Sequence, residues 1–582
     1  MNDQKNLIVA IVLSVAILVG FQLLYQGPKE AAHQAELARQ KALNEETLAP
    51  AAPAAQPGTE VDAPAAPAAG PAVKDRPDAL AAQPRLRINT SSLHGSIRLT
   101  GSRFDDLTLA NYRVTPDRTS PEVILLSPSE AKDGFYAELG WVPGEGTGPV
   151  PDNLTAWEAS GDVLTPSQPV HLTWNNGKGL TFEREIQVDD KFLFTITDRV
   201  KNDGETAATL YPFGLVRRAG AVPASSGYVL TEGPLGVFNG VVKNYTYQAV
   251  AKEGRIPFES TGGWLGITDK YWLVSVIPDQ KEHVSATLQH MQRNGADTWQ
   301  TDFRGDAVQL APGATTEKSY RLFAGAKEAR QLDAYEEQYN IPQFDNAIDW
   351  GWYYFLTKRF FYALDYLAKL SGSFWMAIIL FTVVLRLFFF PIANKQFASF
   401  AKMRRLQPQM AALKERHKDD PPRFQTEMMA LYKKEKVNPL AGCLPIVVQI
   451  PVFYALYKVL YVTIEMRHAP FVGWIKDLSA PDPTHLFNLF GLLPFTPPNF
   501  LHIGLLPIIM GLTMFAQQKL SPANPDPVQQ RIFLLMPVIF TFMMAGFPAG
   551  LVLYWTWSNL LVIGQQWFIM RRYDRLATAG KA

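Results

Sequence analysis

The apolar residues divide the chain into a short apolar start, a long polar half and a second half with several apolar runs. The first run covers residues 7–24 and contains 18 residues without a charge, which is long enough for a helix to cross about 30 Å of hydrocarbon. No small-x-small cleavage site follows this run. The pattern therefore favours an uncleaved transmembrane anchor over residues 1–26 rather than a signal peptide.

Residues 27–84 are rich in Ala, Pro and Gln, with stretches such as APAAPAAQPG. They contain too few large apolar side chains to offset the entropy that ordering would cost. We interpret this segment as an Ala/Pro-rich tether, which places it in the periplasm once the orientation derived below is applied.

Between residues 85 and 326 the pattern changes to short alternating runs. Phe182, Ile186 and Val188 fall on one face of a strand, residues 192–196 repeat the alternation, and the apolar run 271–277 predicts a buried strand. Frequent Gly, Pro and Asn-Gly turn signals separate these runs. The segment is typical of an all-β sandwich of roughly 240 residues.

Residues 345–371 predict an amphipathic helix. Over residues 350–370 the large apolar residues recur at spacings of three and four, whereas four charged side chains interrupt the surface. The aromatic start of this segment favours a helix lying in the membrane interface. An ordinary amphipathic helix packed on the β domain is the alternative.

The remaining apolar runs predict a five-helix membrane core over residues 372–570. The five candidate spans are 374–390, 441–464, 503–518, 532–547 and 549–569. Within residues 392–440, apolar residues recur at spacings of three and four, and the run Asp-Asp-Pro-Pro at 419–422 interrupts this pattern. The segment therefore predicts two antiparallel helices with one apolar seam.

Local charge sets the expected orientation. Residues 394–440 carry eleven basic and five acidic side chains, and the tail at 571–582 is also basic. By the positive-inside rule both lie in the cytoplasm, so six spans would leave both termini cytoplasmic and the β domain in the periplasm of a bacterium. The basic hairpin could meet lipid headgroups, ribosomal RNA or acidic partners, or it could simply be a solvated hairpin that sets the topology.

The sequence gives no sign of catalysis. The formal net charge is +1, and Cys443 is the single cysteine, which excludes a disulfide framework and any multi-cysteine metal site. HExxH and Walker-type motifs are missing, and no pair of aspartates lies inside the apolar runs. We expect a protein that is not an enzyme, with no catalytic residue, no cofactor and no metal.

One charge, Arg386, falls well inside a predicted span, where an arginine usually faces a wet cavity or a partner unless it snorkels to the interface. Gln449, Gln517 and Gln565 lie toward the cytoplasmic ends of their spans, and Asn559 lies near mid-depth. Together these groups predict a polar pocket that is open to the cytoplasm and closed toward the outside. Hydrogen bonding between helices is the alternative for each amide.

Three motifs carry a resemblance to a known family: residues 402–408 (KMRRLQP), residues 438–453 (NPLAGCLPIVVQIPVF) and residues 547–554 (FPAGLVLY), the last followed by Ser558 and Asn559. The chain resembles the YidC/Oxa/Alb family of membrane protein insertases, in its Gram-negative, inner-membrane form. The resemblance implies an insertase and chaperone that inserts nascent inner-membrane proteins, alone or with the Sec translocon. It also implies that residues 85–326 form a periplasmic β-supersandwich.

The resemblance also assigns site residues. Arg386 becomes the central arginine of a hydrophilic groove, and a hydrophobic slide runs beside it. The family's paired tyrosines are Tyr554 and Trp555 here. The implied groove consists of Thr382, Arg386, Gln449, Gln517, Tyr554, Trp555 and Asn559, and the implied slide contains Ile450, Pro451, Phe453 and Met543.

The implied partners are nascent membrane proteins, the Sec translocon with its accessory subunits, the ribosome through the hairpin and tail, and membrane lipids, but not DNA. Two other classes stay open. A secondary transporter would need internal repeats and a polar path to both faces. A membrane-anchored periplasmic enzyme or binding domain would need clustered acid and base residues in the β domain.

Overall fold

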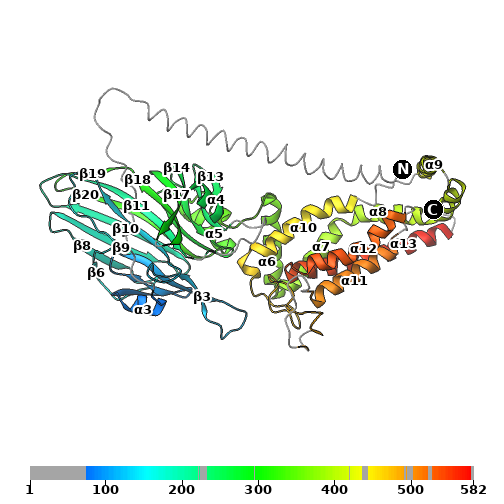
Figure 1. Cartoon of the computed structure of the whole chain (residues 1–582), viewed down its shortest axis with the longest axis horizontal. Coiled ribbons are helices and arrows are strands. Elements are labelled where there is room, and N and C mark those ends of the chain that lie inside the picture. Colours follow the sequence, from blue (N-terminus) through cyan, green and yellow to red (C-terminus); the bar gives the residue numbers. More distant parts are fainter. Residues whose placement is uncertain are drawn as a thin grey trace, which may run out of the picture.

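The computed structural model describes residues 74–578 except 221, 223–231, 294, 419, 436–443, 490–492, 494–502 and 522–526. The anchor predicted at 1–26 and most of the tether predicted at 27–84 lie outside the described residues. A β domain and a helical region stand next to each other along the long axis of the molecule (Figure 1).

The β domain is a sandwich of two sheets, one with eleven strands and one with nine. The larger sheet contains β1 (Arg85–Asn89), β2 (Leu93–Arg98), β3 (Arg103–Arg113), β4 (Glu122–Leu126), β5 (Phe135–Pro143), β7 (Val163–Leu164), β11 (Ala208–Ala219), β14 (Arg255–Thr261), β17 (His283–Arg293), β18 (Ala296–Gly305) and β19 (Val308–Leu310). The smaller sheet contains β6 (Glu158–Ala159), β8 (Val170–Asn175), β9 (Leu180–Val188), β10 (Leu193–Asn202), β12 (Gly233–Phe238), β13 (Val241–Asn244), β15 (Trp264–Thr268), β16 (Trp272–Ile277) and β20 (Thr315–Ala326).

The alternation in the sequence explains how the strands face the core. In β9, Phe182, Ile186 and Val188 are buried while their neighbours are more exposed, which confirms the predicted face. Arg184 shares that buried face, and its guanidinium donates two hydrogen bonds, of 2.6 and 2.7 Å, to the carboxylate of Asp198 on β10. The strand β16, predicted as buried from its apolar run, is buried along nearly its whole length.

The helices of the described residues lie mostly in the second half of the chain. They are α3 (Arg76–Ala81), α4 (Tyr247–Glu253), α5 (Ala329–Tyr339), η2 (Phe344–Ala347), α6 (Tyr354–Ser371), α7 (Phe374–Phe388), α8 (Phe390–Arg416), α9 (Pro421–Lys434), α10 (Leu444–Val462), η4 (Ile464–Met466), α11 (Leu505–Leu520), α12 (Pro527–Met544) and α13 (Ala549–Thr578). The first two belong to the β domain, and α6 to α13 form the helical region (Figure 1).

A sharp bend separates α6 from α7. Gly372 ends α6 with a φ of 76°, a left-handed conformation that favours glycine, and the chain bends by 120° between the two helices. Judged by length and apolar composition alone, no single helix within the described segments suffices to cross a bilayer, whereas the bent pair α6 and α7 does so together. The six predicted spans therefore stay a prediction.

The hairpin α8–α9 lies at the end of the helical region opposite the β domain (Figure 1). The side chain of Asp420 accepts the backbone N–H of Arg423 and so caps the start of α9. The two helices pack along a seam of apolar side chains that is centred on Leu406, Met410 and Tyr432. Farther along, the Arg405 guanidinium donates to the backbone carbonyl of Tyr573 at 2.6 Å, which ties the hairpin to the end of α13.

Contacts also join the β domain to the segment between α10 and α11. The hydroxyl groups of Tyr271 and Ser479 lie 3.3 Å apart, and the Arg467 guanidinium stacks over the Trp272 ring at 5.3 Å. Glu465, in η4, accepts the backbone N–H of Ala329 at the start of α5 at 2.9 Å. The β domain and the helical region therefore share one continuous packed boundary.

Candidate functional site

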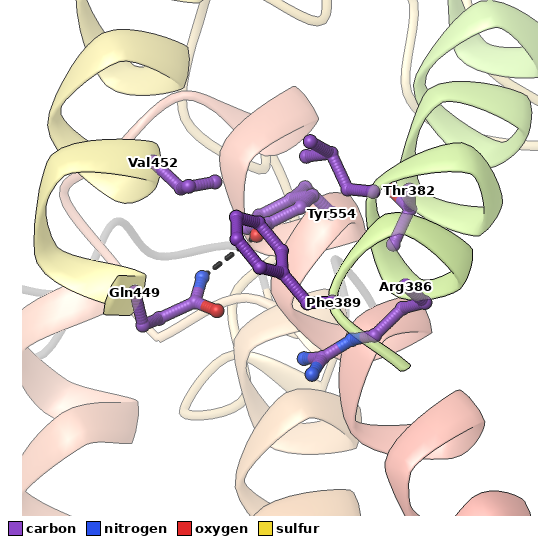
Figure 2. A pocket seen from close by; sticks show the side chains of 7 residues that line it. Thr382, Arg386, Phe389, Gln449, Val452 and Tyr554 are labelled. Atoms are coloured by element: carbon purple, nitrogen blue, oxygen red, sulfur yellow. Dashed lines mark hydrogen bonds between the residues drawn. The ribbon is translucent and has the colours of Figure 1, made fainter. Parts of the chain in front are cut away.

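Arg386 lies on α7, one helical turn after Thr382, so both side chains project from one face of that helix. They line a small cavity together with Leu385, Phe389, Gln449, Val452 and Tyr554, which come from α7, α10 and α13 and from the junction of α7 with α8. Figure 2 shows these side chains converging from three sides. The cavity volume is about 20 Å³, which is room for about one water molecule.

The hydrogen-bond partner of the Arg386 guanidinium is a neutral group. The guanidinium donates a hydrogen bond to the hydroxyl of Ser558 on α13. Across the part of the chain that the structure describes, no carboxylate lies within salt-bridge distance of Arg386. Sequence reasoning missed Ser558 as a partner, although its spacing of four residues from Tyr554 puts both on one face of a helix.

The opposite wall of the cavity is a polar pair and an aromatic ring. The amide of Gln449 donates to the phenolic oxygen of Tyr554 at 2.7 Å. The ring of Phe389 stands between Gln449 and Arg386 (Figure 2). Because the cavity has room for only about one water molecule and this ring forms part of its wall, an entering segment would have to move Phe389 or another lining side chain.

The structure does not bring every residue of the predicted groove to this cavity. Trp555 turns away from Tyr554 and packs edge-on against Phe453 at 5.0 Å between ring centroids. Asn559 donates to the hydroxyl of Thr513 at 3.1 Å, which is the hydrogen bond between helices that sequence reasoning left open for the amides. Gln517 lies on α11 and is not among the residues that line the cavity.

The residues of the predicted slide lie on α10 and α12. Ile450 is 60% exposed and Met543 is 47% exposed, whereas Pro451 and Phe453 are half-buried. Around Met543, α12 presents a continuous apolar surface whose members are each between 46% and 56% exposed: Ile532, Phe533, Leu534, Leu535, Val538, Ile539, Phe542 and Met543. A face of this kind is unfavourable in water and suits a hydrocarbon environment or an apolar segment.

Lys458 on α10 does not reach solvent. Its side chain is 4% exposed, and its ammonium forms an ion pair with Asp349 at 3.0 Å. The segment between η2 and α6 brings the Asp349 carboxylate to the end of α10, so the lysine is neutralised within the protein.

The comparisons with known proteins cover nearly all of the chain. The family model described as the YidC periplasmic domain matches residues 85–363, and that of the 60Kd inner membrane protein matches residues 366–576. The membrane protein insertase YidC of Methylobacterium nodulans is 50% identical over 98% of this chain and 95% of the relative, and that of Rhizobium meliloti is 49% identical over 98% and 96%.

The chain belongs to the YidC family of membrane protein insertases. It is an insertase of the inner membrane, with a periplasmic domain, and it works as an insertase rather than as an enzyme.

Two solved structures are also similar. An active YidC insertase with its first transmembrane domain resolved gives a TM-score of 0.36 at 18% identity and covers 83% of this chain and 92% of that one. A galactose mutarotase-like protein from Lactobacillus casei gives a TM-score of 0.28 at 12% identity and covers 41% of this chain and 99% of that one. Since both TM-scores are below 0.5, the family assignment rests on the sequence matches.

Proposed function

We propose that this insertase takes the polar part of a nascent membrane protein into a groove at Arg386 and releases the apolar part along α10 and α12 into lipid. Arg386, Thr382, Gln449 and Tyr554 form the inner wall of this groove, and Gln517 and Asn559 extend its polar lining along α11 and α13. Ile450, Pro451, Phe453 and Met543, with Trp555 behind them, form the slide.

The observation that carries this proposal is the cation of Arg386 inside a cavity, with only neutral hydrogen-bond partners around it within the described residues. A carboxylate moved into a low-dielectric region is costly unless it meets an opposite charge. An acidic tail that enters the groove would meet this guanidinium, so each charge lowers the cost of burying the other.

The apolar surface of α12 supports the second step. A client segment that leaves the groove would lie against the exposed side chains of α12 and Ile450, and then against lipid. Burial of apolar surface contributes about 25 cal/mol per Å² removed from water. This gain needs no nucleotide, in keeping with a sequence that has no Walker motif.

The placement of the basic hairpin supports the membrane orientation that local charge predicts. Eleven basic residues against five acidic ones lie in the segment 394–440, whose helices α8 and α9 are at the end away from the β domain (Figure 1). With the hairpin in the cytoplasm, the β domain lies in the periplasm, and six spans leave both termini cytoplasmic. The same basic surface would receive ribosomes, and the core would hand clients over beside the Sec translocon.

Purified full-length protein in liposomes tests the proposal. The assay measures protease protection of a single-span client whose translocated tail is acidic, for wild type, Arg386→Ala and Arg386→Lys, with Arg199→Ala on the exposed face of the β domain as the matched control. We expect Arg386→Ala to insert about tenfold more slowly, because it loses a charged hydrogen-bonding partner, and Arg386→Lys to keep most of the rate.

Two outcomes oppose the proposal. If Arg386→Ala, with wild-type thermal stability, matches wild type on the acidic client, the groove does not work through this charge. If wild type inserts nothing without other components, insertion by the protein alone is wrong, and a role that depends on the Sec translocon takes its place.

A further inference from the structure

A second and larger cavity lies in the β domain, remote from Arg386. It has a volume of about 470 Å³ and is formed by β3, β5 and β11 of the eleven-stranded sheet together with residues 149–153. Cavities that hold small molecules usually measure about 300–1,000 Å³ and combine apolar walls with a few polar groups. The size of this cavity therefore suits a compact ligand.

Two of the three arginines that line the cavity are neutralised within the protein. Arg103 forms an ion pair with Glu138, and its Nη1 donates to the hydroxyl of Ser129 at 2.8 Å. Arg184 donates to both carboxylate oxygens of Asp198. Arg184 also donates to the hydroxyl of Ser102 and to the backbone carbonyl of Leu139, so four of its five N–H groups are used within the protein and its role is structural. The pair of Arg103 and Glu138 instead offers a donor and an acceptor side by side.

Arg217 differs from the other two. Its Nε donates to the amide oxygen of Gln300 at 2.6 Å, its Nη2 donates to the same oxygen, and its Nη1 donates to the hydroxyl of Tyr136 at 3.1 Å. No carboxylate within the described ranges lies within salt-bridge distance of it, and its side chain is almost completely buried. A guanidinium carries more N–H donors than these two neighbours use, so Arg217 keeps donors for a further partner.

Aromatic rings and prolines provide the rest of the wall. Those that line the cavity are Trp141, Trp157, Phe213, Pro143, Pro149 and Pro151. The indole N–H of Trp157 and the Nε–H of Arg103 are buried and have no hydrogen-bond partner among the described residues. Unsatisfied buried donors are rare in folded proteins and point to a missing partner.

The balance of charges indicates what kind of ligand fits. Glu138 and Asp152 line the same space as Arg217, so a carboxylate or phosphate would meet repulsion as well as attraction. Adjacent hydroxyl groups suit this mixture, because each can accept from a guanidinium and donate to a carboxylate, while the ring faces cover the apolar side of the molecule. We propose that this cavity binds a neutral polyhydroxylated molecule with the size of a mono- or disaccharide.

Calorimetric titration of the full-length protein in nanodiscs tests this proposal, with maltose, cellobiose and di-N-acetylchitobiose as probes and succinate as an anionic comparison. We expect saturable, millimolar binding of at least one disaccharide and none of succinate. Arg217→Met should weaken binding about tenfold, the loss expected for one charged hydrogen-bonding group. Glu138→Gln should weaken it less, and Arg199→Ala, on an exposed strand face, should bind as wild type does.

Three results would overturn the proposal. The first is the absence of saturable binding by all three disaccharides. The second is binding of succinate in their place, which would make the cavity an anion site. The third is unchanged affinity in both Arg217→Met and Trp157→Phe when both variants keep the wild-type melting temperature, since the sugar would then bind elsewhere.

Discussion

Glu465 offers a sharp test of how the β domain and the helices hold together. Its side chain is buried in η4, and one carboxylate oxygen accepts the backbone N–H of Ala329 at 2.9 Å while the other has no hydrogen-bond partner among the described residues. Burial raises the pKa of this carboxyl from 4.5 to about 7. The contact between η4 and α5 should therefore depend on pH near neutrality.

The direction and the size of this pH dependence follow from the difference between the pKa values of the closed and the open form. Below pH 4.5 the carboxyl is protonated whether the contact is formed or open, and it contributes no pH dependence. Between 4.5 and about 7 the closed contact retains a proton that the opened form has lost, so the contact weakens as pH rises and stays weak above 7. The full difference is on the order of 3 kcal/mol, because one pKa unit corresponds to about 1.4 kcal/mol.

The perturbation is Glu465→Gln, which keeps an acceptor for the Ala329 amide but does not titrate. Hydrogen exchange of the α5 amides, corrected for the intrinsic rate at each pH, reports the opening free energy of this contact. Wild type should lose protection from pH 5 to about pH 7 and change little above that, and the variant should stay level throughout. Glu317→Gln, at an exposed position on β20, serves as the control and should behave as wild type does.

Equal slopes in wild type and Glu465→Gln would refute the reasoning, because the pH dependence would then come from another group. A wild-type slope of the opposite sign would show that the ionised carboxylate stabilises the contact, contrary to its buried position.

Two further predictions concern the helical region. Phe389→Ala should speed insertion of the acidic client severalfold in the liposome assay, because it removes a ring from the wall of the cavity at Arg386 and so widens it, whereas Leu387→Ala, on the exposed side of α7, should not. A slower Phe389→Ala variant of normal stability would contradict a blocking role. Asp349→Ala should destabilise the protein by about 3–5 kcal/mol in thermal unfolding, because it removes the carboxylate that pairs with the buried Lys458. The double variant Asp349→Ala with Lys458→Met should regain most of that stability, because no buried charge is then left unpaired. A single variant as stable as the double variant would show that the pair contributes little.

Much of the local structure could be predicted from the sequence because it depends on short-range periodicity. The alternation around Phe182 predicts a strand with one buried face, and the apolar runs of the second half predict helices at the positions where α7 and α10 to α13 occur. The charged and proline-rich break at 419–422 predicts the end of one helix and the start of the next, and the cap by Asp420 follows from its carboxylate.

The candidate site could be predicted only in part. Tyr554 and Trp555 are neighbours in the sequence, yet consecutive helical residues point about 100° apart, so only one of them can face the cavity at Arg386. Asn559 is likewise rotated toward α11, where Thr513 accepts its hydrogen bond. Residue type made each of these a candidate, but the rotation of α13 against its neighbours selected among them.

The sheet-forming and helix-forming segments, the basic excess of residues 394–440 and the arginine within an apolar run can all be read from the sequence. Each of these features depends on residues that are only a few positions apart. The partners of the buried charged groups depend instead on how the elements pack: Ser558 accepts a hydrogen bond from Arg386, Asp349 pairs with Lys458, and Glu465 accepts the N–H of Ala329 at the start of α5. These partners are distant in sequence, and the packing of whole helices and sheets fixes which of many chemically equivalent side chains come within hydrogen-bonding distance.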